Sequence, residues 1–394
     1  MTHWPTARLD ECTRIVSGAT PSTTVDEYWN GDICWATPKD LSELSSPYLD
    51  DTPRKITKSG LDSCATEILP AGSVLFSSRA PIGHVAINRV PTATNQGFKS
   101  FIPDPKRLFP AFLYYWLRAN RTYLESLGNG ATFKEVSKAT VSRIEIPIPP
   151  LPEQRRIAAI LDQAEALRAK RRQALTKLGT LTQSFFIDLF GDPFTNPKGW
   201  ILRPLGEQLL FLTSGGRGWA EFYSATGSRF IRSFDVQMNY IGTEDVVFVA
   251  PPDNAEAERT KVQAGDVLLT ITGSRIGRVA PVSQELAGAY ISQHVAILRP
   301  NPKTIEPLFL SFFLSMESGG QRQIAKHQYG QTKPGLNFES IKSFQVPVPP
   351  ISDQRDFVRG MRVVERVRNS QTASCSKMDA LFASFQYRAF RGEL

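Results

Sequence analysis

One phrase of the sequence occurs twice, 200 residues apart. The stretch IEIPIPPLPEQRR covers residues 144–156, and FQVPVPPISDQRD covers residues 344–356. The spacing of 200 between matching residues then holds as far as Phe185 and Phe385. A repeat of this length indicates that the chain contains two copies of one structural plan. The constant spacing further indicates that the segment after the phrase tolerates no insertion in either copy.

Upstream of this phrase the two copies keep the same order of motifs but not the same spacing. The spacing is 196 residues between Trp4 and Trp200, and 193 residues between AGSVLF at Ala71 and AGDVLL at Ala264. Such drift indicates loops of different length on a common scaffold. The matching residues are mostly apolar, Gly or Pro, whereas polar stretches such as LGNGATFKEVSK and HQYGQTKPGLN do not match. We therefore expect the two copies to share a fold and to differ in the surfaces that recognise other molecules.

The length of the chain also indicates several domains. A chain of 394 residues exceeds what one hydrophobic core usually supports. Each copy mixes short alternating stretches with one apolar helical run. This pattern predicts an α+β protein with two similar mixed α/β domains, separated by two long antiparallel coiled-coil helices in a pseudo-twofold repeat. The predicted domains cover 1–150 and 193–350, and the predicted helices cover 151–192 and 351–394.

The segment of constant spacing predicts a long helix in each copy. Pro152 suits a first helical turn, and Glu153 lies favourably at the positive end of the helix dipole. Residues on one face then recur at alternating intervals of three and four, which is the pattern of a coiled-coil seam. The predicted seam consists of Ile157, Ile160, Ala164, Leu167, Arg171, Ala174, Leu178, Leu181 and Phe185, and of Phe357, Gly360, Val364, Val367, Gln371, Ser374, Met378, Leu381 and Phe385.

Both predicted seams carry a large polar residue at the same midpoint, Arg171 and Gln371. The order domain, helix, domain, helix favours antiparallel pairing, which would bring these two residues together. We interpret them as a register device, because a polar core position costs stability but penalises misaligned pairings. A solvent-facing position is the alternative. The same topology predicts that Leu394 lies near Met1, and a helix of about 36 residues, about 54 Å long, would place the domains at opposite ends of a rod.

Composition argues against several classes of protein. No apolar run approaches 18 residues, so we expect no membrane span, and the start MTHWPTARLDEC lacks the features of a secretory signal. The four cysteines form no C-x-x-C pair, which argues against a zinc site and a disulfide framework. We expect a cytoplasmic location. The net charge of +8 favours a polyanionic partner, although proteins without such partners also carry this charge.

The sequence gives little support for catalysis. The four histidines, His3, His84, His294 and His327, have no neighbouring nucleophile or carboxylate pattern. The Gly-rich stretches GSRIG and TSGGRG lack the G-K-[ST] ending of a phosphate-binding loop. No cluster has the spacing of metal ligands. We therefore interpret the chain as non-catalytic, with no bound metal and no cofactor of its own.

Several long phrases resemble one protein family. The stretch IPIPPLPEQRRIAAILDQAEALRAKRRQALTKLGTLTQSFFIDLFGDP is similar to the central helical region of DNA-specificity subunits of type I restriction-modification enzymes. FQVPVPPISDQRD and ASFQYRAFRGEL resemble that family's second helical region, and YWNGDICWATPKDL, TNQGFKS, SQHVAIL and GATFKEVSK resemble phrases of its target recognition domains. The wording ISDQRD departs mildly from the family's commoner LPEQ, and the second seam is less apolar.

The resemblance implies a function and a set of partners. It implies two target recognition domains, each of which reads one half of an asymmetric, split sequence in double-stranded DNA. The paired helices would act as a spacer and as the docking site for two methyltransferase subunits. Those partners, and not this chain, would bind S-adenosylmethionine and modify adenine. Two endonuclease-translocase subunits would complete a restriction complex, unless the system only methylates.

Basic residues and two histidines of the two domains are the predicted DNA contacts. Arg can hold guanine with two hydrogen bonds, and Lys neutralises phosphate. For each single residue, an ordinary solvated loop position is the alternative. The predicted contacts are Lys39, Arg79, His84, Lys99, Lys134 and Lys138 in the first domain, and Arg217, Arg232, Arg275, Arg278, His294, Lys326 and Lys333 in the second.

Two other functions remain open at this point. A two-part scaffold could bind proteins through its coiled coil and its globular ends, without DNA specificity. A stand-alone nuclease or methyltransferase is the least favoured reading. A steep fall of affinity with salt would favour the DNA-binding reading over the protein scaffold, because phosphate contacts release counterions.

Overall fold

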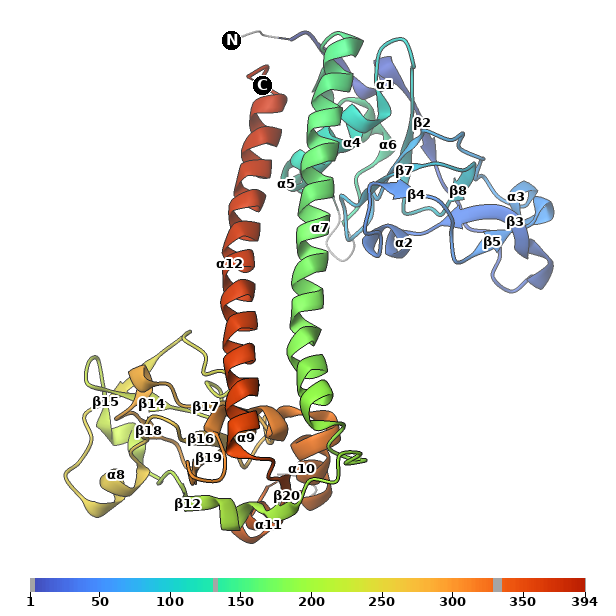
Figure 1. Ribbon diagram of the computed structural model, residues 1–394. Helices are drawn as coiled ribbons and strands as arrows, with labels where there is room; N and C mark the ends of the chain where they lie inside the picture. Colours follow the sequence, from blue (N-terminus) through green and yellow to red (C-terminus); the bar gives the residue numbers. More distant parts are fainter. Residues whose placement is uncertain (1–3, 130–133, 329–334, 394) are drawn as a thin grey trace. The chain divides into compact units, whose positions relative to one another are not determined.

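A computed structural model describes residues 4–129, 134–328 and 335–393 of the chain. The contacts divide the chain into two compact units. Unit 1 consists of residues 1–175 and 370–394, and unit 2 consists of residues 176–369. Each unit contains one mixed α/β domain together with half of each of two long helices, α7 (Leu151–Phe190) and α12 (Ile351–Ala389) (Figure 1). The mixed α/β class, the long helices and the internal repeat are therefore confirmed.

The domain of unit 1 contains three sheets and several short helices. The five-stranded sheet has the order β2-β9-β6-β7-β4, the three-stranded sheet has the order β5-β3-β8, and β1 pairs with β10. Its strands are β1 (Thr6–Arg8), β2 (Thr13–Ser17), β3 (Trp29–Ala36), β4 (Tyr48–Leu49), β5 (Lys55–Ile56), β6 (Val74–Phe76), β7 (Val85–Asn88), β8 (Thr92–Thr94), β9 (Lys99–Pro103) and β10 (Glu145–Pro147). Its helices are α1 (Leu9–Cys12), α2 (Pro38–Ser42), α3 (Lys58–Asp62), α4 (Pro110–Ala119), α5 (Arg121–Ser126) and α6 (Lys138–Ser142).

The domain of unit 2 repeats this plan. The order β12-β19-β16-β17 matches β2-β9-β6-β7, the parallel pair β14 and β18 matches β3 and β8, and β11 pairs with β20 as β1 pairs with β10. Its strands are β11 (Leu202–Pro204), β12 (Leu209–Ser214), β13 (Tyr223–Ser224), β14 (Ser228–Ile231), β15 (Val247–Val249), β16 (Val267–Thr270), β17 (Val279–Pro281), β18 (Tyr290–Ile291), β19 (Val295–Pro300) and β20 (Gln345–Pro347). Its helices are α8 (Ala255–Thr260), α9 (Pro307–Ser315), α10 (Arg322–His327) and α11 (Phe338–Ser343).

The repeated phrase builds the junction between each domain and its long helix. Its glutamine, Gln154, is fully buried near the start of α7. The Gln154 Oε1 atom accepts a hydrogen bond from the backbone N–H of Phe109, at 2.8 Å. Its Nε2 atom donates to the carbonyl oxygens of Arg107 and Pro149, each at 2.8 Å. Because Phe109 is the N-cap residue of α4, one side chain ties the starts of two helices together.

Gln354 makes the same set of bonds in unit 2. It accepts from the backbone N–H of Glu306, the N-cap residue of α9, at 2.9 Å. It donates to the carbonyl oxygens of Thr304 at 3.0 Å and Pro349 at 2.8 Å. A one-residue insertion after the two prolines would move this amide away from its partners, which explains why the phrase and its spacing recur.

The two long helices run antiparallel within unit 1. Arg168 of α7 contacts Asp379 of α12 at 2.6 Å, and Arg171, one turn later, donates to Gln371 on an earlier turn of α12. The predicted meeting of Arg171 and Gln371 is therefore present. Arg168 also pairs with Glu165 at 2.6 Å, and its guanidinium lies 4.2 Å from the ring centre of Phe382.

The packing of the helices differs from the predicted seam at Leu167, Ala174, Leu181, Val367 and Leu381, which are exposed, whereas Ile160, Gly360 and Ser374 are half-buried. Ile157, Ala164, Arg171, Leu178 and Phe185 are buried or half-buried. The intervening positions on the inner face are residues 161, 168, 175 and 182, one residue after the predicted ones. The exposed fraction is 58% for Leu167 and 45% for Leu181 in α7, and 42% for Val367 and 52% for Leu381 in α12. These four residues, called here the apolar edge, flank the helix contact instead of filling it.

Aromatic side chains fill the contact between the two long helices in unit 2. The rings of Phe185 and Phe357 stack with centres 5.8 Å apart, and Phe186 packs on Phe309 of α9 at 5.5 Å. Gly360 allows this approach, because a Cβ atom there would lie 2.3 Å from Cε1 of Phe185. The helices and the domain of this unit therefore share one hydrophobic core.

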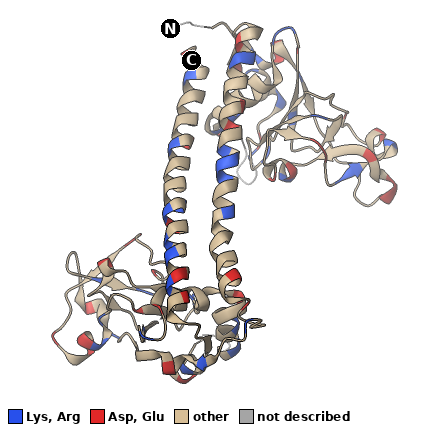
Figure 2. Ribbon diagram, viewed as in Figure 1, with Lys and Arg blue, Asp and Glu red and all other residues tan. Residues whose placement is uncertain are grey.

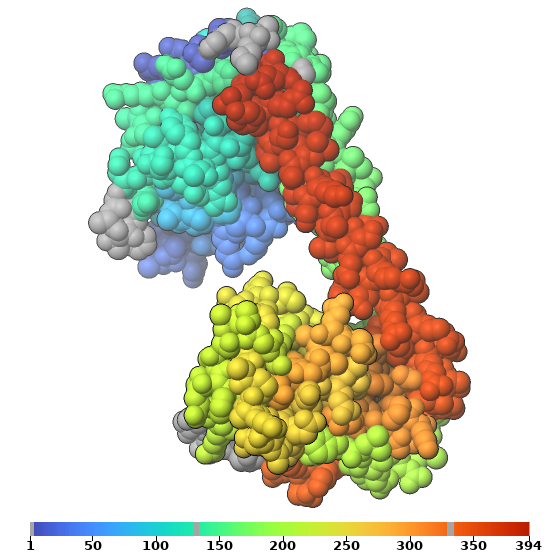
Figure 3. All heavy atoms as spheres, turned by 90° about the vertical axis from the view of Figure 1, so that its left-hand side faces the viewer, coloured from blue at the N-terminus to red at the C-terminus, as the bar shows by residue number. Residues whose placement is uncertain are grey.

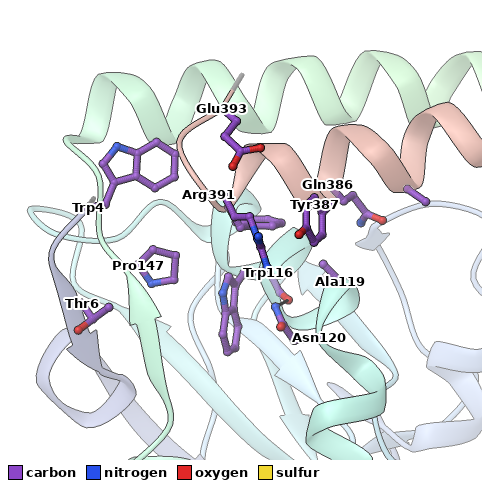
Figure 4. Close-up of a pocket in the computed structure, with 12 residues that line it drawn as sticks. Trp4, Thr6, Trp116, Ala119, Asn120, Pro147, Gln386, Tyr387, Arg391 and Glu393 are labelled. Carbon is purple, nitrogen blue, oxygen red and sulfur yellow. Dashed lines mark hydrogen bonds between the residues drawn. The ribbon is translucent and has the colours of Figure 1, made fainter. Parts of the chain in front are cut away.

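The first and last described residues meet within unit 1. Trp4 and Glu393 line one cavity of about 710 Å³, together with Trp116, Tyr387 and Phe390 (Figure 4). Met1 and Leu394, whose proximity the topology predicts, lie outside the described residues. Among the described residues, no helix has the length and apolar character needed to cross a membrane. The same residues contain no group of three or more His, Cys, Asp and Glu that could hold a metal ion.

Candidate nucleic-acid interface

Loops at the ends of matching strands create a cavity of about 770 Å³ in unit 2. It is lined by Ser214–Arg217 after β12, by Thr272 and Gly273 after β16, by Gln293 and His294 before β19, and by Arg259 of α8. Two predicted contacts, Arg217 and His294, therefore lie on one cavity. Arg259, which sequence analysis missed, donates to the carbonyl oxygen of Ser214 at 2.9 Å. Arg217, Arg259 and His294 around an open hollow can hold a phosphate, and the Glu256 side chain lines the same cavity.

The cavity wall is held by short polar contacts. The Thr272 hydroxyl lies 2.5 Å from Nδ1 of His294, and Nε2 of Gln293 lies 3.2 Å from Nε2 of the same ring. Gly216 is required where the loop passes α8, because a Cβ atom there would lie 1.3 Å from Oε1 of Glu256. The Gly-rich stretch TSGGRG thus serves close packing of a loop.

A second group of predicted contacts in unit 2 supports an exposed aromatic tip at Phe234. Its side chain is 49% exposed. The Arg275 guanidinium lies 4.0 Å from the centre of the ring and donates to the carbonyl oxygen of Phe234 at 3.1 Å. Arg232 binds Asp235 through two bonds of 3.0 and 2.9 Å, which raises the pKa of Arg232. Arg278 donates to the side chain of Gln237, which belongs to the loop that carries Phe234.

These contacts change the roles expected for Arg232 and Arg278. Both guanidinium groups are occupied by the loop that carries Phe234, so they shape the tip. Arg275 remains the basic group that lies against the exposed ring. Phe234 itself is not among the residues predicted from the sequence, although its alignment with Lys39 indicates it: the two residues precede Asp235 and Asp40, which match in the repeat.

Lys39 and Phe234 occupy equivalent tips. The Asp40 carboxylate accepts from the backbone N–H of Thr37 at 2.6 Å, just as the Asp235 carboxylate accepts from the backbone N–H of Arg232 at 2.7 Å. The Lys39 side chain points into solvent, and Glu43 lies 3.8 Å from its ammonium. The same turn therefore presents a cation in one domain and an aromatic ring in the other.

Arg79 and Lys99 in unit 1 share one carboxylate. Arg79 donates to Glu135 at 2.9 Å, and the Lys99 ammonium lies 3.3 Å from the other Glu135 oxygen. Burial raises the pKa of Glu135, but its hydrogen bonds with Arg79 and Lys99 outweigh this effect and hold the pKa below its usual value. The Lys99 side chain is only 10% exposed. The expectation that Lys99 faces DNA therefore does not agree with its burial; it fastens the loop of Glu135.

The remaining predicted contacts are scattered. His84 lines a separate cavity of about 570 Å³ beside α7, with Arg118, Arg121 and Arg172, and burial and then Arg121 lower the pKa of His84. Lys134, Lys138 and Lys326 are exposed. Lys333 lies outside the described residues. Figure 2 shows that basic residues also recur along both long helices and mix with acidic residues in the loops.

A family model described as "Type I restriction modification DNA specificity domain" matches residues 1–177 and 233–373. The chain is 35% identical over 239 residues to the MjaIX type I restriction enzyme specificity subunit of Methanocaldococcus jannaschii, a match that spans 56% of this chain and 55% of that protein. It is 24% identical over 369 residues to the EcoKI specificity subunit of Escherichia coli, covering 87% of this chain and 78% of that protein.

Solved structures show the same fold. A chain from a structural study of complex assembly and conformational transition in a type I restriction-modification system matches with a TM-score of 0.64 and 18% identity, covering 100% of this chain and 99% of that chain. The S subunit of a type I restriction-modification system from M. genitalium matches with a TM-score of 0.58 and 15% identity, covering 98% and 96%.

Proposed function

Because this chain belongs to the type I restriction-modification DNA specificity family, we propose that its two domains read two different halves of one DNA sequence. As a specificity subunit it confers DNA target specificity and is not an enzyme. The observation that carries the two-part target is the pair of unlike tips on one scaffold. Lys39 and Phe234 occupy equivalent turns. Lys39 can contact a phosphate, whereas Phe234 can make an apolar contact with a base. Two unlike readers in one chain recognise an asymmetric target, whereas a symmetric dimer reads a palindrome.

The proposal assigns a role to each part of the chain. Residues 1–150 and 193–350 are the two target recognition domains, and residues 151–192 and 351–394 are the helices that set the spacing between the half-sites. In unit 2, Arg217, Arg259 and His294 face one cavity, and Arg275 backs the Phe234 ring, so these residues approach DNA together. In unit 1, Lys39, Arg79, Lys134 and Lys138 are the exposed cations of the DNA surface. A protein that reads the cell's DNA acts in the cytoplasm of a prokaryote.

The long helices suit the docking of partner subunits. The apolar edge consists of Leu167 and Leu381 in unit 1 and of Leu181 and Val367 in unit 2. Leu167 matches Val367, and Leu181 matches Leu381, 200 residues apart in the repeat. Figure 3 shows that α12 forms part of the surface along its length. Exposed leucines on a helix pair are typical of a further helix packing alongside. We assign this edge to two methyltransferase subunits, which would bind S-adenosylmethionine and methylate adenine in each half-site.

Restriction would need further partners. The relatives' names describe specificity subunits of restriction enzymes. Two endonuclease-translocase subunits joined to the methyltransferase complex would make this chain part of a restriction system. Without them the complex would only methylate.

The experiment that tests the proposal maps methylated adenines across the genome of a host that carries this chain and its methyltransferase partner. We expect one motif made of two unlike half-sites separated by a fixed number of unspecified base pairs. A palindromic motif, or no new methylation, would contradict the proposal. Binding of the purified complex to DNA should also weaken steeply with salt, because phosphate contacts release counterions. Salt-independent binding to protein partners alone would favour the scaffold function.

A further inference from the structure

A glutamine stands at the tip of the same turn in both recognition domains. In unit 1 the turn is Asn95–Phe98, and in unit 2 it is Ser292–Val295, with Gln96 and Gln293 at the second position. The backbone N–H of the fourth residue donates to the carbonyl oxygen of the first in both turns, at 3.2 and 3.0 Å. The first residue donates its own backbone N–H to a strand end, from Asn95 to Ala36 at 3.1 Å in unit 1 and from Ser292 to Ile231 at 3.0 Å in unit 2.

A glycine packs the neighbouring loop against each turn. A Cβ atom at Gly18 would lie 2.2 Å from the carbonyl oxygen of Asn95, and one at Gly215 would lie 2.1 Å from that of Ile291. No side chain fits in either place. The backbone that carries each glutamine is therefore fixed from two sides, in the same way in both domains.

The glutamine side chains, in contrast, have no common partner in the fold. Gln96 is exposed and accepts a hydrogen bond from the hydroxyl of Thr20. Gln293 is half-exposed and contacts the ring of the adjacent His294. The other matched glutamines behave differently, because Gln154 and Gln354 are fully buried and make the same bonds in both units. The fold accounts for Gln154 and Gln354 but not for Gln96 and Gln293.

Cationic groups stand next to both turns. The carbonyl oxygen of Gly97 accepts from the backbone N–H of Ser78 at 2.8 Å, so the loop of Arg79 adjoins Gln96. In unit 2, Arg217 and Arg259 line the same cavity as Gln293, together with one acidic residue, Glu256. A neutral amide beside cations can donate a hydrogen bond to a phosphate oxygen.

We propose that Gln96 and Gln293 make the same contact in the two domains, a hydrogen bond from the side-chain amide to a phosphate of the DNA backbone. This inference rests on the proposed function. Two readers with unlike tips share only what their half-sites share, and the sugar-phosphate backbone is common to every DNA sequence. These residues fix the position of the duplex so that the unlike groups around them meet the bases.

The test measures binding of the full chain, in complex with its methyltransferase partner, to fluorescent duplexes that carry the mapped target or a target with one half-site altered. We expect Gln96→Ala and Gln293→Ala each to weaken binding about three- to tenfold, by the same factor on every duplex, because one hydrogen bond is lost. The dependence on salt should stay the same, since a neutral group releases no counterion. Gln96→Lys and Gln293→Lys should restore binding and steepen the salt dependence by about one phosphate contact.

Matched controls separate this role from a structural one. Gln263→Ala removes an exposed glutamine elsewhere in unit 2, and Thr20→Ala removes the protein partner of Gln96; both should bind DNA like the parent. Thermal unfolding should be unchanged in all variants. A loss confined to duplexes with one particular base would make the glutamines base readers, and unchanged binding would leave them without a role in DNA contact; either result overturns the inference. A parent complex that shows no salt-dependent DNA binding would instead overturn the proposed function.

Discussion

Gln154 is one of two equivalent buried glutamines, with Gln354, whose removal should destabilise the fold. Its fully buried amide accepts a hydrogen bond from one backbone N–H at the start of α4 and donates to two carbonyl oxygens. We expect Gln154→Ala to lower the free energy of unfolding by about 2–4 kcal/mol, because buried polar groups lose their partners. Thermal and urea unfolding measure this change. Gln173→Ala, an exposed position on the same helix, is the control, and an equal effect of the two substitutions would contradict the junction role.

Phe234 should determine part of the target sequence. Its ring is half-exposed and lies against Arg275, so Phe234→Ala removes an apolar contact with bases but few contacts within the protein. We expect the second half-site to become more permissive at one or two positions and the first half-site to stay unchanged. Mapping of methylated adenines measures both. Tyr223→Ala, another exposed aromatic residue of unit 2, should leave the motif unchanged; an altered first half-site in Phe234→Ala would contradict the assignment.

The contacts of individual side chains were the features that the sequence predicted least well. Lys99 follows the turn Asn95–Phe98 and suggests a surface cation, yet its ammonium is covered by Glu135, which lies 36 residues further along the chain. Arg232 is likewise occupied by Asp235 of its own loop, and Arg278 by Gln237, which lies 41 residues earlier in the loop that carries Phe234. Such pairings depend on loop conformations that no local pattern specifies. The locations of Arg217 and His294, next to matched strands, were easier to predict, because the scaffold places them.

At the scale of elements, α7 shows why a heptad pattern can select the wrong line of residues. The line Ile160, Leu167, Ala174, Leu181 is more apolar than the line Leu161, Arg168, Leu175, Thr182, so a sequence pattern prefers the first. The structure turns the second line inward. Arg168 is acceptable there because Glu165, Asp379 and the ring of Phe382 surround its guanidinium. Leu167, Ala174 and Leu181 of the more apolar line are thereby left on the surface, whereas Ile160 is half-buried.

The apolar edge should bind a partner subunit. We expect Leu167→Asp combined with Leu381→Asp to weaken binding of the methyltransferase subunit by tenfold or more, since burying a leucine contributes roughly 1.5–3 kcal/mol. Co-purification and titration of the partner measure the change. Leu210→Asp, an exposed leucine in β12, should have no effect. Equal partner binding in the double variant and the parent would remove the apolar edge from the docking surface.

The polar pair inside the helix contact gives a separate test at the same scale. Arg171 and Gln371 hydrogen-bond to each other in unit 1. Replacing both by Leu should raise the thermal stability, because two desolvated polar groups become an apolar contact, and should loosen the alignment of the helices. Distances between spin labels on α7 and α12 measure the alignment. A single, unchanged distance in the double variant would show that the pair does not set the register.

At the scale of the whole molecule, the repeat made the order of strands predictable where local patterns could not. The pairing β2-β9-β6-β7 recurs as β12-β19-β16-β17, although many strands are only two to four residues long. The loops that differ between the copies remained unpredictable because each is packed by its own contacts. The helices, whose lengths are 40 and 39 residues, differ by one residue, as expected for a segment that tolerates no insertion.

This fixed length leads to a prediction about the DNA target. A heptad inserted after Leu175 in α7, together with one after Asn369 in α12, keeps the inner faces in phase and adds about 10 Å to each helix. If the helices set the distance between the half-sites, the unspecified spacer should lengthen by at most about three base pairs, at about 3.4 Å per base pair. Both half-site sequences should stay as they are, because neither domain is changed.

Methylation mapping in a host with the lengthened chain measures spacer and half-sites together. An insertion in α7 alone is the control, since it shifts one helix against the other and should abolish methylation at every spacing. A lengthened chain that methylates the parental spacing would show that the helices do not measure the distance. Loss of the half-site sequences would instead mean that each domain depends on the other to read its part of the target.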